Sequence, residues 1–176
     1  MEVRCIILGA SGVGKTALVN TTRPEVEKRY QSTIGVDYAV YRKNNPSVTL
    51  HIWDTSGSKR FDYVVDVFLK KVDIIVFVYK CSGSFTYLIK KLKEVKKKGV
   101  GKRFCIVSFS DPHLGRALAR KYGYLFVHIT SEQQKLQVFT MIATFCYEEN
   151  KRCNFLVPKV PYPKERDSGY CWFSIC

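Results

Sequence analysis

The chain has 176 residues, of which 46% are apolar and 14% aromatic, enough for one hydrophobic core and enough to exclude wholesale disorder. Its formal net charge of +14 favours anionic partners such as phosphates, nucleic acid or an acidic membrane surface. No apolar run approaches the roughly 20 residues that cross a bilayer, so a transmembrane protein is not expected. Residues 1–10 are predicted to form a buried strand and not a signal peptide.

The seven cysteines include no CxxC pair, and several lie inside apolar runs. Cysteine packs there as a small apolar residue. This usage favours a reducing, cytosol-like compartment and argues against a zinc site or a disulfide framework.

Apolar runs and helical patterns alternate along the chain. Buried strands are predicted over 3–8, 74–79, 104–109 and 124–129. Two further strands, 36–42 and 48–53, flank Asn44-Asn45-Pro46, which predicts a hairpin. Helical spacing predicts helices over 15–20, 85–95, 114–122 and 136–145. The apolar stripe of the last helix comprises Leu136, Phe139, Ile142 and Phe145.

This alternation predicts an α/β fold with a roughly six-stranded, mostly parallel sheet and about five helices on its two faces. The hairpin adds one antiparallel edge strand. The periodic pattern stops at about Lys151, where prolines and mixed charges begin. We therefore expect a folded domain over 1–150 and a flexible tail over 151–176.

A glycine-rich loop follows the first predicted strand and precedes a helix. Its sequence, Gly9-Ala10-Ser11-Gly12-Val13-Gly14-Lys15-Thr16, matches GxxxxGK[ST]. Such a loop wraps its backbone around a phosphate and offers N–H donors from residues 11–14. Lys15 is expected to reach the β- and γ-phosphates, and the Thr16 hydroxyl to bind Mg²⁺. The motif predicts a nucleotide phosphate site without defining the reaction, because kinases and many ATPases share it.

Two further segments narrow the choice. Ser32-Thr33-Ile34-Gly35-Val36-Asp37 precedes the hairpin, and Trp53-Asp54-Thr55-Ser56-Gly57 ends its second strand. With these segments, residues 3–147 resemble the Ras-like small GTPases, most closely the Rab branch. The resemblance implies a P-loop NTPase (small GTPase) fold and a switch that binds GTP or GDP with Mg²⁺ in vesicle traffic.

The resemblance also implies roles for single residues. Thr33 would give Mg²⁺ a second protein oxygen and bind the γ-phosphate through its N–H, while Asp54 would hold the metal through a water. The Gly57 N–H would touch the γ-phosphate. Ser32–Asp37 and Ser58–Val64 would be switch loops, released on loss of that phosphate and read by effector proteins, an exchange factor or a GTPase-activating protein.

The catalytic position departs from the family pattern. Ser58 stands where the family has a glutamine that orients the attacking water. A serine side chain is too short to hold that water from this position. With Lys15 and Thr33 retained at the reacting phosphate, we expect slow hydrolysis and a long-lived triphosphate state.

The base-reading motifs depart further. Ser108-Phe109-Ser110-Asp111 replaces NKxD, so only Asp111 could accept the two N–H groups of guanine. Thr130-Ser131-Glu132 replaces the SAK-type loop and keeps at most a backbone N–H, and Val26 stands where an aromatic clamp usually covers the base. Polar contacts carry most base discrimination. We therefore expect weakened affinity and relaxed preference for GTP over ATP, with Phe109 stacking on the base.

A lysine-rich stretch follows the fourth strand. A solvated helix face is the default interpretation, with an anionic lipid surface or an acidic partner as the functional alternative and no specific nucleic-acid site. The residues are Lys90, Lys91, Lys93, Lys96, Lys97, Lys98, Lys102 and Arg103.

The ending matches neither a CaaX box nor a paired-cysteine signal. A lipid on Cys171 or Cys176, a tail folded back on the domain and a tail bound to a partner all stay open. We expect a cytoplasmic protein, on the cytosolic face of an endomembrane in the lipidated case.

Three functions compete for this sequence. The first is a Rab-like switch with slow GTP hydrolysis. The second is a non-catalytic interaction module with a GTPase-like shape and weak nucleotide binding, which Ser58 and the altered base motifs favour. The third, a nucleotide kinase, is disfavoured because no acceptor-substrate lid is visible.

Overall fold

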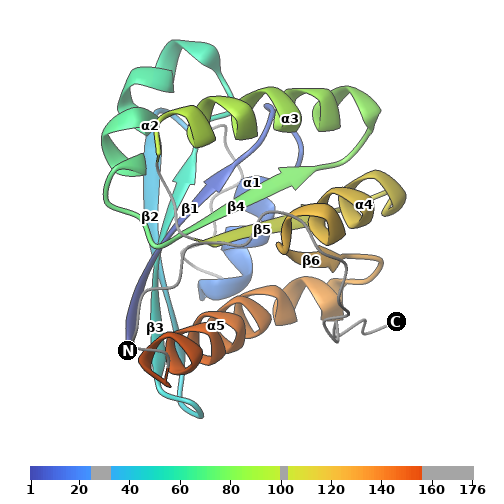
Figure 1. The fold of residues 1–176 in the computed structure, drawn as a ribbon. Helices are drawn as coiled ribbons and strands as arrows, with labels where there is room; N and C mark the ends of the chain where they lie inside the picture. The colour runs from blue at the N-terminus through green and yellow to red at the C-terminus, as the bar shows by residue number, and fades with distance from the viewer. Residues whose placement is uncertain (25–32, 100–102, 156–176) are drawn as a thin grey trace.

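The computed structural model describes residues 1–24, 33–99 and 103–155, and within them six strands form one sheet (Figure 1). The strand order is β2-β3-β1-β4-β5-β6, and only β2 is antiparallel to its neighbour, which confirms the predicted sheet and hairpin. The strands are β1 (Glu2–Leu8), β2 (Val36–Lys43), β3 (Val48–Thr55), β4 (Ile74–Tyr79), β5 (Arg103–Ser108) and β6 (Leu125–His128).

Helices cover both faces of this sheet. Helices α1 and α5 pack on one face, and α2, α3 and α4 pack on the other (Figure 1). They are α1 (Lys15–Val19), α2 (Asp62–Leu69), α3 (Ser82–Lys97), α4 (His113–Tyr122) and α5 (Glu132–Phe155). Short 3₁₀ turns, η1 (Asn20–Thr22) and η3 (Lys59–Phe61), follow α1 and precede α2.

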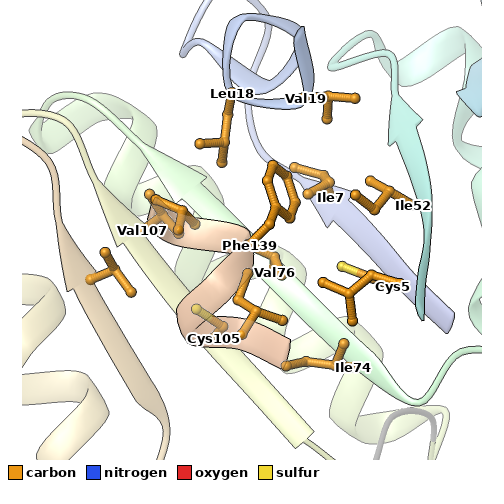
Figure 2. Packing of buried hydrophobic residues seen from close by; sticks show 14 of the residues in the cluster. Cys5, Ile7, Leu18, Val19, Ile52, Ile74, Val76, Cys105, Val107 and Phe139 are labelled. Atoms are coloured by element: carbon orange, nitrogen blue, oxygen red, sulfur yellow. The ribbon is translucent and has the colours of Figure 1, made fainter. Parts of the chain in front are cut away.

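The central strands are continuous apolar runs because both of their faces are buried. In β1, Cys5 and Ile7 face α1 and α5, whereas Ile6 and Leu8 face the opposite helices. Phe139 of α5 is fully buried against this first face (Figure 2). The apolar core thus fixes β1 in the centre of the sheet, with the glycine-rich loop at its carboxyl end.

Two sequence predictions about helices are corrected here. Ser58–Val64 is not a loop throughout, because η3 lies within it and α2 begins at Asp62. Val65 and Leu69 lie one helical turn apart and are buried on the same core, which gives α2 its own packing face. Leu136, predicted for the apolar stripe of α5, is 57% exposed, since α5 packs on the sheet only from Val138 onward.

Some predictions fall on residues outside the described ranges. Val26, Ser32 and Lys102 are among them, as are Cys171 and Cys176 of the predicted tail. Helix α5 continues past position 150 to Phe155. The boundary between domain and tail stays a prediction.

Candidate functional site

The loop after β1 depends on three glycines. Gly12 and Gly14 have positive φ angles of 75° and 101°, a conformation that other residues rarely adopt. A Cβ on Gly9 would lie 2.4 Å from a carbonyl oxygen of β4, so the backbone must pass close to that strand. Ser11 and Gly12 are exposed, whereas the Val13 side chain is buried in the core. The loop therefore presents backbone to solvent on its outer side and is anchored on its inner side.

Lys15 is the first residue of α1, and its side chain is buried beneath this loop. Its Nζ donates hydrogen bonds to the carbonyl oxygens of Gly9 at 2.9 Å and Ala10 at 2.8 Å. An ammonium has three N–H groups, so these contacts leave one more to be used. Burial lowers the pKa of Lys15 to about 8, although attraction from Asp54 opposes this shift. A buried cation in this position gains from an arriving anion such as a phosphate.

Three oxygen-bearing side chains from distant parts of the chain meet beside Lys15. The Thr16 hydroxyl lies 2.6 Å from Asp54 Oδ2 and 2.9 Å from the Thr33 hydroxyl, and Thr33 Oγ1 lies 3.3 Å from the same carboxylate oxygen. Burial raises the pKa of Asp54, although both hydroxyls and Lys15 oppose this shift. The other carboxylate oxygen, Asp54 Oδ1, is buried without a hydrogen-bond partner.

This oxygen cluster, Thr16, Thr33 and Asp54, fits a magnesium ion. Mg²⁺ takes oxygen ligands at 2.0–2.1 Å in octahedral geometry, which places adjacent ligands about 2.9 Å apart. The two threonine hydroxyls, hydrogen-bonded to each other at 2.9 Å, are close enough to serve as adjacent ligands. The unsatisfied carboxylate oxygen can accept from a metal-bound water. No group of three His, Cys, Asp or Glu suited to a metal occurs among the described residues.

The first predicted switch segment contacts the end of β3, and Gly57, directly before the second segment, lies against the glycine-rich loop. A Cβ on Gly57 would lie 2.2 Å from the backbone nitrogen of Ser11, so this position tolerates only glycine. The Ser56 N–H donates to the Gly35 carbonyl oxygen at 2.8 Å. Ser58, directly after Gly57, is partly buried, and its N–H donates to the Ser56 hydroxyl at 3.3 Å. The structure thus gathers both segments at the phosphate side of the site.

The lysine-rich stretch is not a uniformly solvated face. Lys91 is buried and lies 3.2 Å from Asp62 and 3.5 Å from Glu94, and Lys98 lies 2.7 Å from Asp66. These contacts join α3 to α2, the helix of the second switch segment, which lies beside it (Figure 1). The default interpretation is therefore wrong for Lys91, because α2 supplies a carboxylate, that of Asp62, which the sequence did not pair with it.

Other lysines of the stretch do face outward. Lys96 lies over the ring of Tyr122, 3.9 Å from its centroid, and so contacts the end of α4. Lys90, Lys93 and Lys97 are exposed. These three remain candidates for an anionic partner.

On the base side, Ser108 and Asp111 form a corner between β5 and α4. Ser108 is fully buried, and its hydroxyl donates to the Asp111 carbonyl oxygen at 3.0 Å. That oxygen also accepts from the Tyr79 hydroxyl at 2.6 Å. The Asp111 side chain accepts the N–H of His113, in the first turn of α4, at 2.9 Å. The side chain of Ser108 is therefore directed into the protein and not toward a ligand.

Phe109 and the loop before α5 complete the base side. A Cβ on Gly14 would lie 3.3 Å from the Phe109 ring, so this ring lies beside the glycine-rich loop. Thr130 donates its N–H at 2.7 Å and its hydroxyl at 2.8 Å to Gln134 Oε1. The Ser131 hydroxyl accepts the Gln134 N–H at 3.3 Å. Thr130 and Ser131 thus cap the amino end of α5, directly before its first residue.

Sequence reasoning missed several supporting residues. Arg23, with a side chain only 8% exposed, donates to the Asp37 carboxylate at 2.9 Å and to the Tyr38 carbonyl at 3.0 Å, which ties the first switch segment to η1. No pattern in the neighbouring sequence indicates that Arg23 would be buried and bonded to the first switch segment. The spacing of Asp62 and Asp66 could have indicated their contacts with the lysine-rich stretch. Residues four apart share one face of a helix, so both can contact the same neighbouring helix.

Comparison with known proteins gives a consistent result. The profile of the family described as "Ras of Complex, Roc, domain of DAPkinase" matches residues 4–110. "Ypt/Rab-type GTPase ypt7" of Schizosaccharomyces pombe is 36% identical over 88 residues, 48% of this chain and 43% of that protein. "Ras-related protein RABG3b" of Arabidopsis thaliana is 40% identical over 80 residues, 44% of this chain and 39% of that protein.

A third relative, "GTP-binding protein YPTC5" of Chlamydomonas reinhardtii, is 35% identical over 88 residues, 48% of this chain and 43% of that protein. The matched region thus spans less than half the length of each of these relatives. Within the described residues, no helix has the length and apolar character needed to cross a membrane.

Proposed function

Because this chain belongs to the Ras-like small GTPases, with Rab and Ypt proteins among its relatives, we propose that it is a nucleotide-dependent switch that binds GTP and GDP with Mg²⁺. The observation that carries the proposal is the convergence of Thr16, Thr33 and Asp54 beside the buried Lys15. An ammonium next to hard oxygen ligands is the combination that a metal-bound triphosphate requires.

Each group has a distinct task in this proposal. The backbone N–H groups of Ser11 to Gly14 bind phosphate oxygens, and Lys15 neutralises charge on the β- and γ-phosphates. Thr16 and Thr33 hold Mg²⁺ directly and Asp54 holds it through a water. When bound, the ion neutralises phosphate charge and orients the terminal phosphate. Asp54 is the fixed member of this set, because it lies in a fully buried position at the end of β3.

The switch acts through the segments that touch the γ-phosphate. Thr33 belongs to Ser32–Asp37, and Gly57 immediately precedes Ser58–Val64. Hydrolysis or loss of the γ-phosphate removes a contact from both segments, so their conformations report the nucleotide state. We propose that effector proteins, an exchange factor and a GTPase-activating protein bind these segments.

Hydrolysis is proposed to be slow. Ser58 directly follows Gly57. From the position of Ser58, a longer polar side chain could hold a water in line with the γ-phosphate. A serine hydroxyl is one carbon from the backbone and lacks that reach. The triphosphate state would then persist until a partner supplies the missing group.

By analogy with the Rab and Ypt relatives, the proposed setting is vesicle traffic on the cytosolic face of an endomembrane. The exposed Lys90, Lys93 and Lys97 would supply attraction to an anionic surface. In the same proposal, residues 1–150 form the nucleotide-binding domain and residues 151–176 a tail that contacts membrane or partner.

The first experiment identifies the bound ligand. Purified protein is denatured with acid, the released nucleotide is resolved by chromatography, and the emptied protein is titrated with Mg·GTP and Mg·GDP by calorimetry. The proposal predicts a released purine nucleotide and saturable binding of Mg·GTP and Mg·GDP that weakens when EDTA removes Mg²⁺. An absence of heat with every magnesium nucleotide would overturn it and leave the second candidate, an interaction module with only the shape of a GTPase.

A further inference from the structure

We propose that this site selects its ligand by the magnesium-bound triphosphate chain and accepts any purine base, because the Ser108 and Thr130 hydroxyls and one carboxylate oxygen of Asp111 are bonded within the protein. The inference rests on the proposed function, which supplies the phosphate site. Beyond that function, the ligand class becomes purine nucleoside triphosphates in general, and Asp111 has a structural task.

Ser108 is the first group removed from base recognition. Its side chain has no exposed surface, and its hydroxyl donates to the Asp111 carbonyl oxygen at 3.0 Å. Ser108 Oγ also lies 3.4 Å from the Ser110 N–H that it accepts. A ligand outside the protein surface cannot reach this hydroxyl. The residue closes a turn at the end of β5.

Asp111 is the second group, and it forms the start of α4. Its Oδ1 accepts the His113 N–H at 2.9 Å, which satisfies one of the donors left unpaired in the first turn of a helix. Its carbonyl oxygen is held by two hydroxyls, those of Ser108 and Tyr79. Tyr79 also accepts the N–H of Gly115 in α4 at 3.1 Å. Asp111 is thereby fixed from three elements, β4, β5 and α4.

The short connection explains why this corner is rigid. Only Pro112 separates Asp111 from α4, so the direction of the Asp111 side chain is tied to the start of this helix through the bond from His113. At Gly115 the helix touches Tyr79 directly, since a Cβ there would lie 2.5 Å from the tyrosine hydroxyl. The position of α4 and the orientation of Asp111 are therefore coupled.

The loop before α5 is the third group. The N–H and the hydroxyl of Thr130 both donate to Gln134 Oε1, and the Ser131 hydroxyl accepts the Gln134 N–H. These bonds start α5 in the manner of a helix cap. The polar side chains of this loop are thus engaged with the helix that they begin.

Phe109 is the group that remains for a base. Its ring is partly buried and lies beside Gly14, next to the phosphate loop. Every base has a π-face, so stacking on an aromatic ring tolerates different bases. Such stacking is worth about 5- to 150-fold in affinity per base. Polar readout would instead discriminate by about 10⁴-fold or more.

The test is a competition series on the emptied full-length protein with Mg²⁺ present. A fluorescent GTP analogue is displaced by GTP, ATP, inosine triphosphate and inorganic tripolyphosphate. We expect the three nucleotides to agree within about tenfold, and tripolyphosphate to compete about 5- to 150-fold more weakly. A preference for GTP over ATP above 100-fold would overturn the inference and leave the proposed function intact. Failure of all ligands to bind would instead overturn the proposed function.

Two variants separate stacking from polar readout. Phe109→Ala should weaken GTP and ATP by the same factor and leave tripolyphosphate unchanged. Asp111→Asn keeps an acceptor oxygen for His113 but loses the charge that guanine would need, so GTP and ATP should again change together. A selective loss of GTP binding in Asp111→Asn would show that Asp111 reads guanine. Thermal melting of each variant checks that α4 still forms.

Discussion

The phosphate side and the base side of the site use similar polar residues in opposite ways. On the phosphate side, Thr16, Thr33 and Asp54 converge on a common point and leave one carboxylate oxygen without a partner. On the base side, Ser108 and Asp111 bond to the scaffold around them. Polar side chains serve a ligand when the fold leaves their capacity unfilled, and serve the fold when it does not.

The same contrast separates two buried lysines. Lys91 is partnered by Asp62 and Glu94, and although burial lowers its pKa, these carboxylates raise it above the ordinary value. Lys15 contacts two neutral carbonyl oxygens, and burial lowers its pKa to about 8. Lys91 has its anions in place, whereas Lys15 is arranged to receive one.

Lys15→Ala tests most directly whether the phosphate side binds a ligand. Removing one partner of a buried charged interaction costs about 2–5 kcal/mol, so Mg·GTP binding should weaken about 30- to 4,000-fold. Calorimetric titration measures the loss. Lys90→Ala, on the exposed face of α3, is the matched control and should bind as wild type does. Equal affinity of Lys15→Ala and wild type would mean that the phosphate side is not a ligand site.

Gly115→Ala tests whether the residues of the base side stabilise the fold through close packing of α4 against Tyr79. The added methyl group would lie 2.5 Å from the Tyr79 hydroxyl and 2.8 Å from the Phe126 ring, so we expect about 1–3 kcal/mol of destabilisation in urea unfolding. Gly83→Ala is the control, because a Cβ there meets nothing within 4 Å. Wild-type stability in Gly115→Ala would show that the corner under α4 is loosely packed.

Ser58→Gln sharpens the phosphate side by restoring a water-orienting side chain. Single-turnover release of phosphate should accelerate by about tenfold or more, which is less than the roughly 10²- to 10⁴-fold that a positioned proton-transfer group supplies. Ser58→Ala should keep the wild-type rate, since the serine is too short to take part. If Ser58→Ala slowed hydrolysis while Ser58→Gln did not speed it, the serine itself would be the active group.

The smallest effect on stability is expected for the ion pair between Arg4 and Asp73. This pair lies at the amino ends of β1 and β4, away from the glycine-rich loop. Partial burial raises the pKa of Asp73, but hydrogen bonds from the Arg4 side chain and backbone outweigh it, and the pKa lies below its ordinary value. Such a carboxylate stabilises the fold above its unfolded pKa, about 3.9, and loses this effect as the pH falls through its folded pKa.

Asp73→Asn should therefore lower the free energy of unfolding at pH 7 by about 1 kcal/mol or less. At pH values below the folded pKa of Asp73 the variant and wild type should converge, because protonation removes the same interaction from wild type. Urea unfolding at several pH values measures both. A difference that grows as the pH falls would contradict the assigned sign.

The sequence alone determined the order of the elements and the phosphate side of the site. Strand and helix periods are local properties, so β4 was predicted at its observed bounds, and the hairpin was predicted from its turn residues. The glycine-rich loop was recognisable because its backbone conformation needs glycine at fixed positions, as the positive φ angles of Gly12 and Gly14 show. Helix α2 was missed because its apolar pattern is only two turns long.

Only the tertiary structure decided which polar groups face a ligand. Ser108 was expected to lie at the base, yet it is fully buried, and Lys91 was expected in solvent, yet it lies against α2. Lys91 is paired by Asp62 of α2, and the Asp111 carbonyl that binds Ser108 is also held by Tyr79 of β4. A sequence records which side chains are available. The packing of separated segments determines whether the hydrogen-bonding capacity and the charge of those side chains are already satisfied within the protein.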